Sequence, residues 1–178
     1  MAVLPVVLYP DPRLVAANDP VEDFGAGLQE LITNLKETCW NLPGLGLAAP
    51  QVGINLRLAF VDLSVGRDPA AITVLANPEI VRREGDVRLE EGCLSFPGLF
   101  VTIHRPERIA VRAQDQDAAW RELPASGTLA QAFCHEVDHL NGVLLPDHLN
   151  GFSKRLFALR VRWARRRWRR LPLARYAR

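Results

Sequence analysis

Residues 129–142 read LAQAFCHEVDHLNG, a stretch in which three residues separate two histidines. We interpret it as a helix, with Ser126 or Thr128 as the candidate N-terminal cap. On a helix, His135 and His139 lie one above the other on one face, where both imidazoles can bind one metal ion. The alternative is a chance match to a five-residue pattern on a solvated helix. We favour a metal-binding helix here.

A catalytic metal site of this kind takes three protein ligands and keeps one position open. Glu136 follows the first histidine, where a carboxylate can serve a metal-bound water. The longer metalloprotease pattern would place a histidine at Leu145, while His148 comes three residues too late and no Glu follows Glu136. The third ligand is therefore expected upstream. Cys93, in the segment EGCLS at 91–95, is the strongest candidate, although a free cysteine is usually a buried small hydrophobe.

The other two cysteines have a simpler interpretation. Cys134 adjoins His135 on the helix and points about 100° away from the metal face, so we expect it in the core. Cys39 lies on the apolar face of an earlier helix and is interpreted in the same way. Three cysteines are too few for a disulfide framework, so a reducing cytoplasm is the expected location.

The rest of the 178 residues places this helix in an α+β fold. An amphipathic helix is predicted over 21–40, and the pattern becomes strand-like from about 56 to 127. A basic helix is predicted over 152–170. This order lacks the strict strand-helix alternation of a parallel sheet. No apolar run is long enough for a membrane span, and the N-terminus does not resemble a secretory signal.

Charge divides the chain near residue 150. Residues 1–150 hold all 20 acidic residues and 11 basic ones, a net charge of −9, whereas 151–178 hold 11 basic residues and no acid. We therefore divide the sequence into a catalytic domain, 1–150, and a basic C-terminal helix and tail, 151–178. A strongly basic segment indicates an anionic partner.

A second unusual segment is GLGLAAPQ at 44–51. It loosely matches a dinucleotide-binding fingerprint, but no strand precedes it and Pro50 would fall inside the required helix. We instead interpret it as an extended segment whose glycines allow close approach of backbone to a ligand. Leu45 and Gly46 are then expected to contact the substrate, and Gln51 presents an amide at the end of the segment.

Segments 44–51, 91–95 and 135–142 together resemble, in order and spacing, the three signature motifs of peptide deformylases. The resemblance covers roughly residues 4–160. It implies removal of the formyl group from the N-formylmethionine of nascent polypeptides. It also implies antiparallel sheets around a central metal helix, with Cys93, His135 and His139 binding one divalent metal ion. Fe(II) is usual in the family, and Zn, Ni or Co can occupy the site.

The resemblance also implies roles around the metal. The ion lowers the pKa of its bound water, and Glu136 takes the proton and later delivers it to the leaving amine. The side chain of Gln51 and the backbone N–H of Leu94 are the implied oxyanion donors. A salt bridge between Glu91 and Arg105 is implied to steady the cysteine loop, and the alternative is two independent surface charges.

Three positions depart from the family pattern. Cys134 replaces a usual Gln, Val15 a frequent Arg, and Phe100 a residue that is often Arg or Tyr near the cleft. Phe100 bears on substrate preference rather than on the chemistry. Two other functions remain as alternatives: an H-E-x-x-H metallopeptidase, and a nucleic-acid-binding protein with a structural zinc site.

The predicted basic helix has two apolar stripes and an arginine-rich arc. One stripe comprises Phe152, Leu156, Leu159 and Trp163, and the other Phe157, Val161, Ala164 and Trp168. Either the helix simply docks with a solvated basic face, or one stripe packs on the body while arginines meet ribosomal RNA. The resemblance supports the ribosome, since deformylases act on emerging chains. Membrane-surface binding and dimerisation are further alternatives.

Overall fold

Five antiparallel strands form the main sheet of the computed structural model, in the order β2-β3-β4-β7-β8. They are β2 (Gly46–Ala48), β3 (Leu58–Asp62), β4 (Ile72–Glu84), β7 (Arg108–Gln114) and β8 (Trp120–Ser126). A separate antiparallel pair joins β5 (Val87–Gly92) to β6 (Phe100–Arg105). The structure describes residues 2–171 and 176–177.

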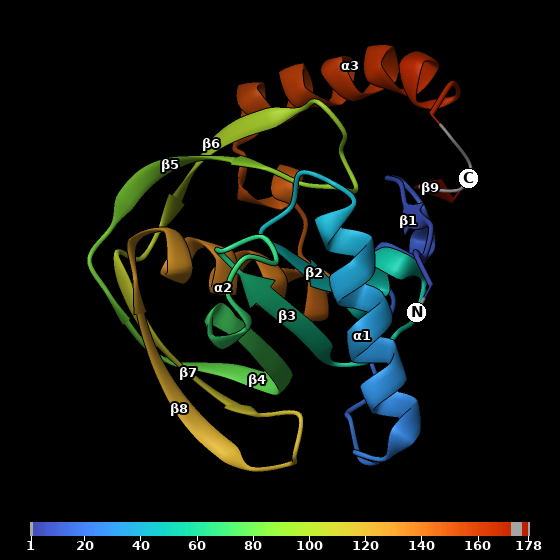
Figure 1. Cartoon of the computed structure of the whole chain (residues 1–178). Helices are drawn as coiled ribbons and strands as arrows, with labels where there is room; N and C mark the ends of the chain where they lie inside the picture. The colour runs from blue at the N-terminus through green and yellow to red at the C-terminus, as the bar shows by residue number, and fades with distance from the viewer. Residues whose placement is uncertain (1, 172–175, 178) are drawn as a thin grey trace.

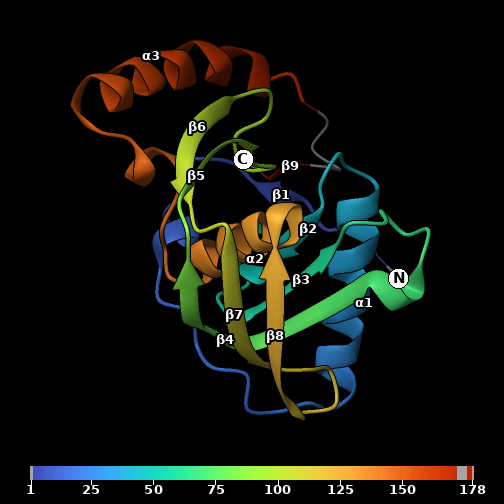
Figure 2. The ribbon, with the colours of Figure 1, turned by 90° about the vertical axis from the view of Figure 1, so that its left-hand side faces the viewer.

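Helix α2 (Gly127–Leu140) lies at the centre of these strands (Figure 1). In Figure 2, β7 and β8 lie in front of it. Its buried apolar side chains, including Phe133 and Leu140, join a core cluster with β3, β4 and β7. The predicted α+β fold, with antiparallel sheets around this helix, is confirmed. Ser126 is at the N-cap position, but its side chain makes no capping hydrogen bond.

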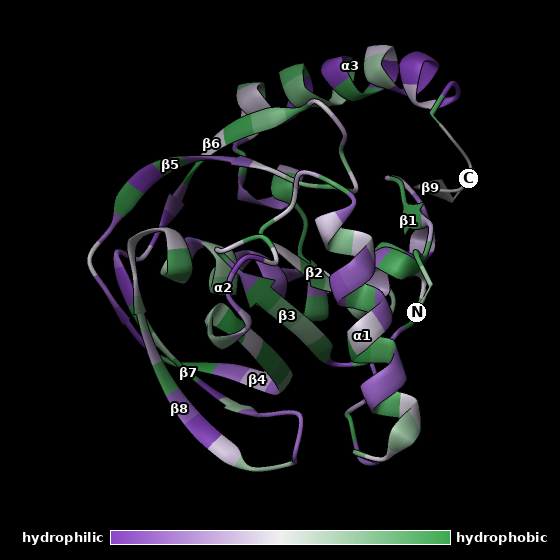
Figure 3. Ribbon diagram, viewed as in Figure 1, coloured by the Kyte–Doolittle hydropathy of each residue, from purple (hydrophilic) through white to green (hydrophobic). Residues whose placement is uncertain are grey.

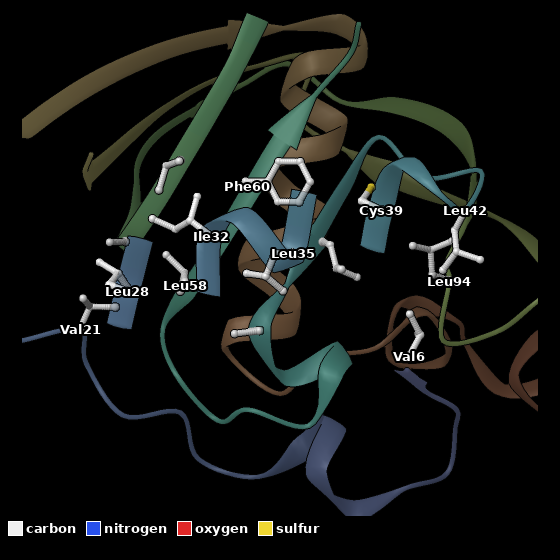
Figure 4. Close-up of a cluster of buried hydrophobic side chains, with 14 residues drawn as sticks. Val6, Val21, Leu28, Ile32, Leu35, Cys39, Leu42, Leu58, Phe60 and Leu94 are labelled. Carbon is white, nitrogen blue, oxygen red and sulfur yellow. The ribbon is translucent and has the colours of Figure 1, made fainter. Parts of the chain in front are cut away.

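Helix α1 (Ala26–Trp40) begins five residues later than the sequence pattern predicted. Leu28, Ile32, Leu35 and Cys39 recur at helical spacing and are buried against β3 (Figure 4). Val21, the first residue of the predicted range, precedes the helix in an extended segment fixed by hydrogen bonds to the side chain of Asn77. Both Cys39 and Cys134 are buried apolar-core residues, as expected.

Strand β4 passes through Asn77-Pro78 without a break. The strand register shifts between Ala76 and Glu79, which marks a β-bulge. Asn77 adopts a positive φ of 51°, which Asn tolerates better than most residues. The bulge lets the strand continue past a proline that cannot donate to the ladder.

Helix α3 (Gly151–Trp168) packs on the body through one of its two apolar stripes. Phe157, Val161 and Trp168 are buried with β6 and the segment before it. The other stripe faces outward, and its end members Phe152 and Trp163 are 80% and 70% exposed. Figure 3 shows hydrophobic and hydrophilic residues alternating along this helix.

Short elements complete the described chain. Strands β1 (Val6–Val7) and β9 (Tyr176–Ala177) pair in parallel. Single 3-10 turns are η1 (Pro12–Val15), η2 (Ala49–Val52), η3 (Pro69–Ala71) and η4 (Leu145–His148). Within residues 2–171 and 176–177, no helix is both long and apolar enough to cross a bilayer.

Candidate metal centre and cleft

Three ligand atoms from two elements meet at the floor of a cleft. Cys93 follows β5 directly, and His135 and His139 lie one turn apart on α2. Their ligand atoms all lie within 4.8 Å of one another, and Cys93 Sγ is 3.2 Å from His139 Nε2. The spacing of the two histidines and the position of the cysteine loop thus converge on one point, as a shared metal ion requires.

The cluster favours a thiolate at its centre. Burial acts to raise the pKa of the Cys93 thiol, but the neighbouring His139 and His135 outweigh that penalty and hold it well below its ordinary value. The Ser95 backbone N–H also points at the sulfur, at 3.4 Å. A deprotonated sulfur with two imidazoles is a donor set that suits Zn, Fe or a similar transition metal.

A buried ion pair fixes the orientation of His135. Glu91 Oε1 and Oε2 accept hydrogen bonds from Arg105 at 2.8 and 2.9 Å, and Glu91 Oε2 lies 3.0 Å from His135 Nδ1. Burial of Glu91 opposes its charge, yet Arg105 and His135 lower its pKa to about 2. The Nδ1 contact leaves His135 Nε2 to face the cysteine. A carboxylate behind a histidine is the usual support for a metal-binding imidazole.

The network continues to the surface through two residues that the sequence analysis did not assign. Arg105 also donates to Asp138 Oδ2 at 2.7 Å, and His148 Nε2 lies 2.7 Å from the same oxygen. His148 is thus engaged by Asp138 and lies outside the metal cluster. The signal for Asp138 was its position on α2, three residues after His135 and so on the same side of the helix.

Glu136 is buried beside the cluster with an unused oxygen. Its Oε2 has no hydrogen-bond partner among the described residues, and burial raises the pKa of the carboxyl to about 7 against the opposing effect of the two histidines. Gly46 of β2 runs directly past it: a Cβ there would lie 2.7 Å from Glu136 Oε1. A glycine is required at 46 because any side chain would displace the carboxylate.

Two donors face the same space. Gln51 Oε1 accepts from the Ala48 N–H at 2.8 Å, which directs the Gln51 amide nitrogen toward Cys93 Sγ at 3.5 Å. The Leu94 N–H donates no hydrogen bond within the described part of the chain. The Gln51 amide nitrogen lies next to the sulfur, and Leu94 lines the same cleft.

The cleft itself has a volume of about 350 Å³. Leu45, Gly46 and Gln51 line one side, and Pro97 to Phe100 line another, with His135 and Glu136 at the floor. The structure therefore brings the predicted site residues to this cleft, except for His139, which is buried against Cys93, and Arg105, which lies in the network directly behind the cleft.

Comparison with known proteins identifies the family to which this chain belongs. A family model described as polypeptide deformylase matches residues 3–155. The chain belongs to the polypeptide deformylase family. It is 42% identical to the peptide deformylase of Acidobacterium capsulatum over 162 residues, which cover 91% of this chain and 95% of that protein. It is 45% identical to the peptide deformylase of Chromobacterium violaceum over 150 residues, 84% of this chain and 89% of that one.

Solved deformylase structures have the same fold. The crystal structure of a peptide deformylase from Legionella pneumophila superposes with a TM-score of 0.88 at 39% identity, covering 96% of this chain and all of that one. A plant peptide deformylase gives a TM-score of 0.87 at 31% identity, with 93% and 90% covered. The enzyme therefore removes the N-formyl group from nascent peptides. This activity replaces the metallopeptidase and nucleic-acid-binding alternatives.

Proposed function

We propose that Cys93, His135 and His139 hold one divalent metal ion in this deformylase, Fe(II) in the cell, with Zn, Ni or Co as substitutes. The observation that carries the proposal is the convergence of one thiolate and two imidazoles beside the unpartnered Glu136 oxygen. Three protein ligands leave a position open, as catalytic sites do. When bound, such an ion acts as a Lewis acid and lowers the pKa of a coordinated water.

In this proposal Glu136 moves the proton. Its Oε2 takes a proton from the attacking water and returns it to the amine nitrogen when the bond to the formyl carbon breaks. A carboxyl with a pKa near 7 is suited to both steps, because it accepts and releases a proton at neutral pH. Gly46 keeps the carboxylate in place by leaving room for it.

The Gln51 side chain and the Leu94 N–H stabilise the oxyanion that forms from the formyl carbonyl. Gln51 is 1% exposed and is oriented by the Ala48 N–H, so its amide pays no reorganisation cost during the reaction. Leu45 and Gly46 contact the formylmethionyl residue with side chain and backbone. Glu91 and Arg105 keep His135 in the correct orientation.

Metal analysis combined with an anaerobic assay of a formyl-Met peptide tests this proposal. The purified enzyme is expected to hold about one ion per chain and to release formate while leaving the peptide intact. Glu136→Gln is expected to keep the metal and lose turnover by a factor of about 10² to 10⁴. A variant with near-parental turnover would remove Glu136 from the proton transfer.

The basic segment 151–178 is proposed to dock the catalytic body, 1–150, on the ribosome. Its partner there is ribosomal RNA, and the location is the cytoplasm, where formylmethionyl chains emerge. The support is an outward arginine face on α3 that includes Arg155, Arg162 and Arg166, all exposed. Phosphate contacts are strongly salt-dependent, so binding is expected to weaken steeply as salt rises.

Co-sedimentation with ribosomes tests the docking. Changing those three arginines to Gln is expected to weaken binding, whereas the same change at Arg82, Arg108 and Arg121 on the body serves as a control of equal charge. Equal loss in both triple variants would show a general charge effect and contradict docking through α3. Deleting α3 from residue 160 onward is a poor test, because it removes the buried Val161 and Trp168.

A further inference from the structure

We propose that α3 positions one wall of the substrate cleft, with Arg160 and Trp168 as the positioning residues. The inference rests on the assignment of this cleft as the substrate site in the proposed function. It gives the C-terminal helix a part in peptide binding, separate from any part in docking.

The wall is the segment from Pro97 to Phe100, which lines the cleft. It follows the cysteine loop and leads into β6, whose described partner strand is β5 alone. The main sheet therefore does not brace it. The Phe100 side chain is 51% exposed, and its ring lies over Gly92, where a Cβ would come within 2.7 Å of it. Phe100 thus presents an apolar ring beside the metal cluster.

Helix α3 holds this wall at both ends. Trp168 Nε1 donates to the carbonyl of Pro97 at 2.9 Å, and Arg160 Nη1 donates to the carbonyl of Phe100 at 3.1 Å. The two donors are eight residues apart on the helix, about 12 Å along its axis. Two hydrogen bonds from one rigid helix thereby fix both ends of a four-residue segment.

Packing below the wall keeps the helix in place. The ring of Phe157 lies 5.7 Å from that of Phe96, the residue just before the wall, and Phe96 stacks on Tyr9 at 4.8 Å. Val161 and Trp168 are 5% exposed and belong to the same apolar cluster as Leu99. In both Figure 1 and Figure 2, the beginning of β6 lies beneath α3.

The geometry separates binding from chemistry. Glu136, His135 and His139 are on α2, which the described contacts of Arg160 and Trp168 do not reach. Loosening the wall should therefore weaken peptide binding and leave the reacting groups in place. A variant of this kind raises KM with kcat retained. Loss of one such hydrogen bond corresponds to about a 3- to 10-fold rise in KM.

Matched substitutions on the same helix test the inference. Trp168→Phe and Arg160→Gln remove one donor each, while Trp163→Phe and Arg167→Gln make the same chemical changes at exposed positions with no described bond to the wall. The readouts are kcat and KM for formyl-Met tripeptides, metal content and thermal unfolding. We expect KM to rise about 3- to 10-fold only in the first pair, with kcat and metal content unchanged.

Three results would overturn the inference: an unchanged KM in the first pair, an equal rise in the control pair, or a fall in kcat with KM retained. Should Trp168→Phe fail to fold, Arg160→Gln decides alone, because that side chain is exposed. Failure of the proposed catalytic roles is distinguishable, since it would show as retained turnover in Glu136→Gln whatever the α3 variants do.

Discussion

Helices α2 and α3 both depart from the usual distribution of side chains, in opposite directions. On α2, Glu136 and His139 are 3% and 2% exposed, although ionisable groups normally stay in water. On α3, Phe152 and Trp163 are 80% and 70% exposed, although large apolar side chains are normally buried away from water. The buried groups of α2 need partners to offset their lost solvation, whereas the exposed stripe of α3 only forgoes the free energy that burial would give.

The two helices also differ in how their polar groups are held. On α2, His135 is supported by Glu91, which is paired with Arg105, itself bonded to Asp138. On α3, Arg166 contacts only the ring of Trp163, at 5.3 Å, among the described residues. Buried charged groups need partners of this kind, whereas exposed charges do not. Substitutions should therefore have large effects on α2 and its supports, and small effects on the outer face of α3.

The largest effect is expected from removing the cysteine ligand. Cys93→Ala takes the only thiolate from the cluster and leaves two imidazoles, so both the metal and the turnover should be lost. Elemental analysis of the purified variant, together with formate release, measures this. A full metal complement in Cys93→Ala would exclude Cys93 as a ligand.

The next largest effect is expected from removing a hydrogen-bond donor to the oxyanion. Gln51→Ala removes one preorganised donor and should lower kcat by about 10²-fold, with metal content unchanged. Steady-state kinetics on the metal-loaded enzyme gives the number. Parental kcat in this variant would assign oxyanion stabilisation to other groups.

A smaller change is expected behind the metal. Glu91→Gln keeps the size of the side chain but removes the charge that supports His135 and pairs with Arg105. Metal affinity, measured by competition with a chelator, should fall about 10- to 100-fold. Glu90→Gln on the same strand is the control. Equal metal affinities in the two variants would contradict the proposal that Glu91 supports metal binding through His135.

The smallest effects should come from α3 and should differ between its faces. Val161→Ala on the buried stripe is expected to lower the free energy of unfolding by about 1–2 kcal/mol, through lost burial. Phe152→Ser on the exposed stripe should change it by less than about 0.5 kcal/mol. Chemical denaturation measures both, and similar losses would mean that the outer stripe is also packed against something.

The grouping of His135 and His139 with Cys93 was predictable because the signal on the helix is local. Two histidines four residues apart on a helix can reach one metal, and Cys93 was the best ligand left by elimination. The long-range features were not predictable. The two apolar stripes of α3 have similar composition, so only the surface under the helix determines that Phe157 is buried and Leu156 exposed. Nor does any spacing connect Arg160 with a carbonyl 60 residues earlier.

Helix α3 joins the cleft wall on one side and an outward, arginine-rich surface on the other. A partner that shifts the helix when it binds would also shift the wall, so the two binding events would be thermodynamically linked. Linkage is reciprocal: the factor by which the partner changes peptide affinity equals the factor by which a bound peptide changes affinity for the partner. The affinity of such an enzyme for the partner of α3 would therefore change when a formylated chain occupies the cleft.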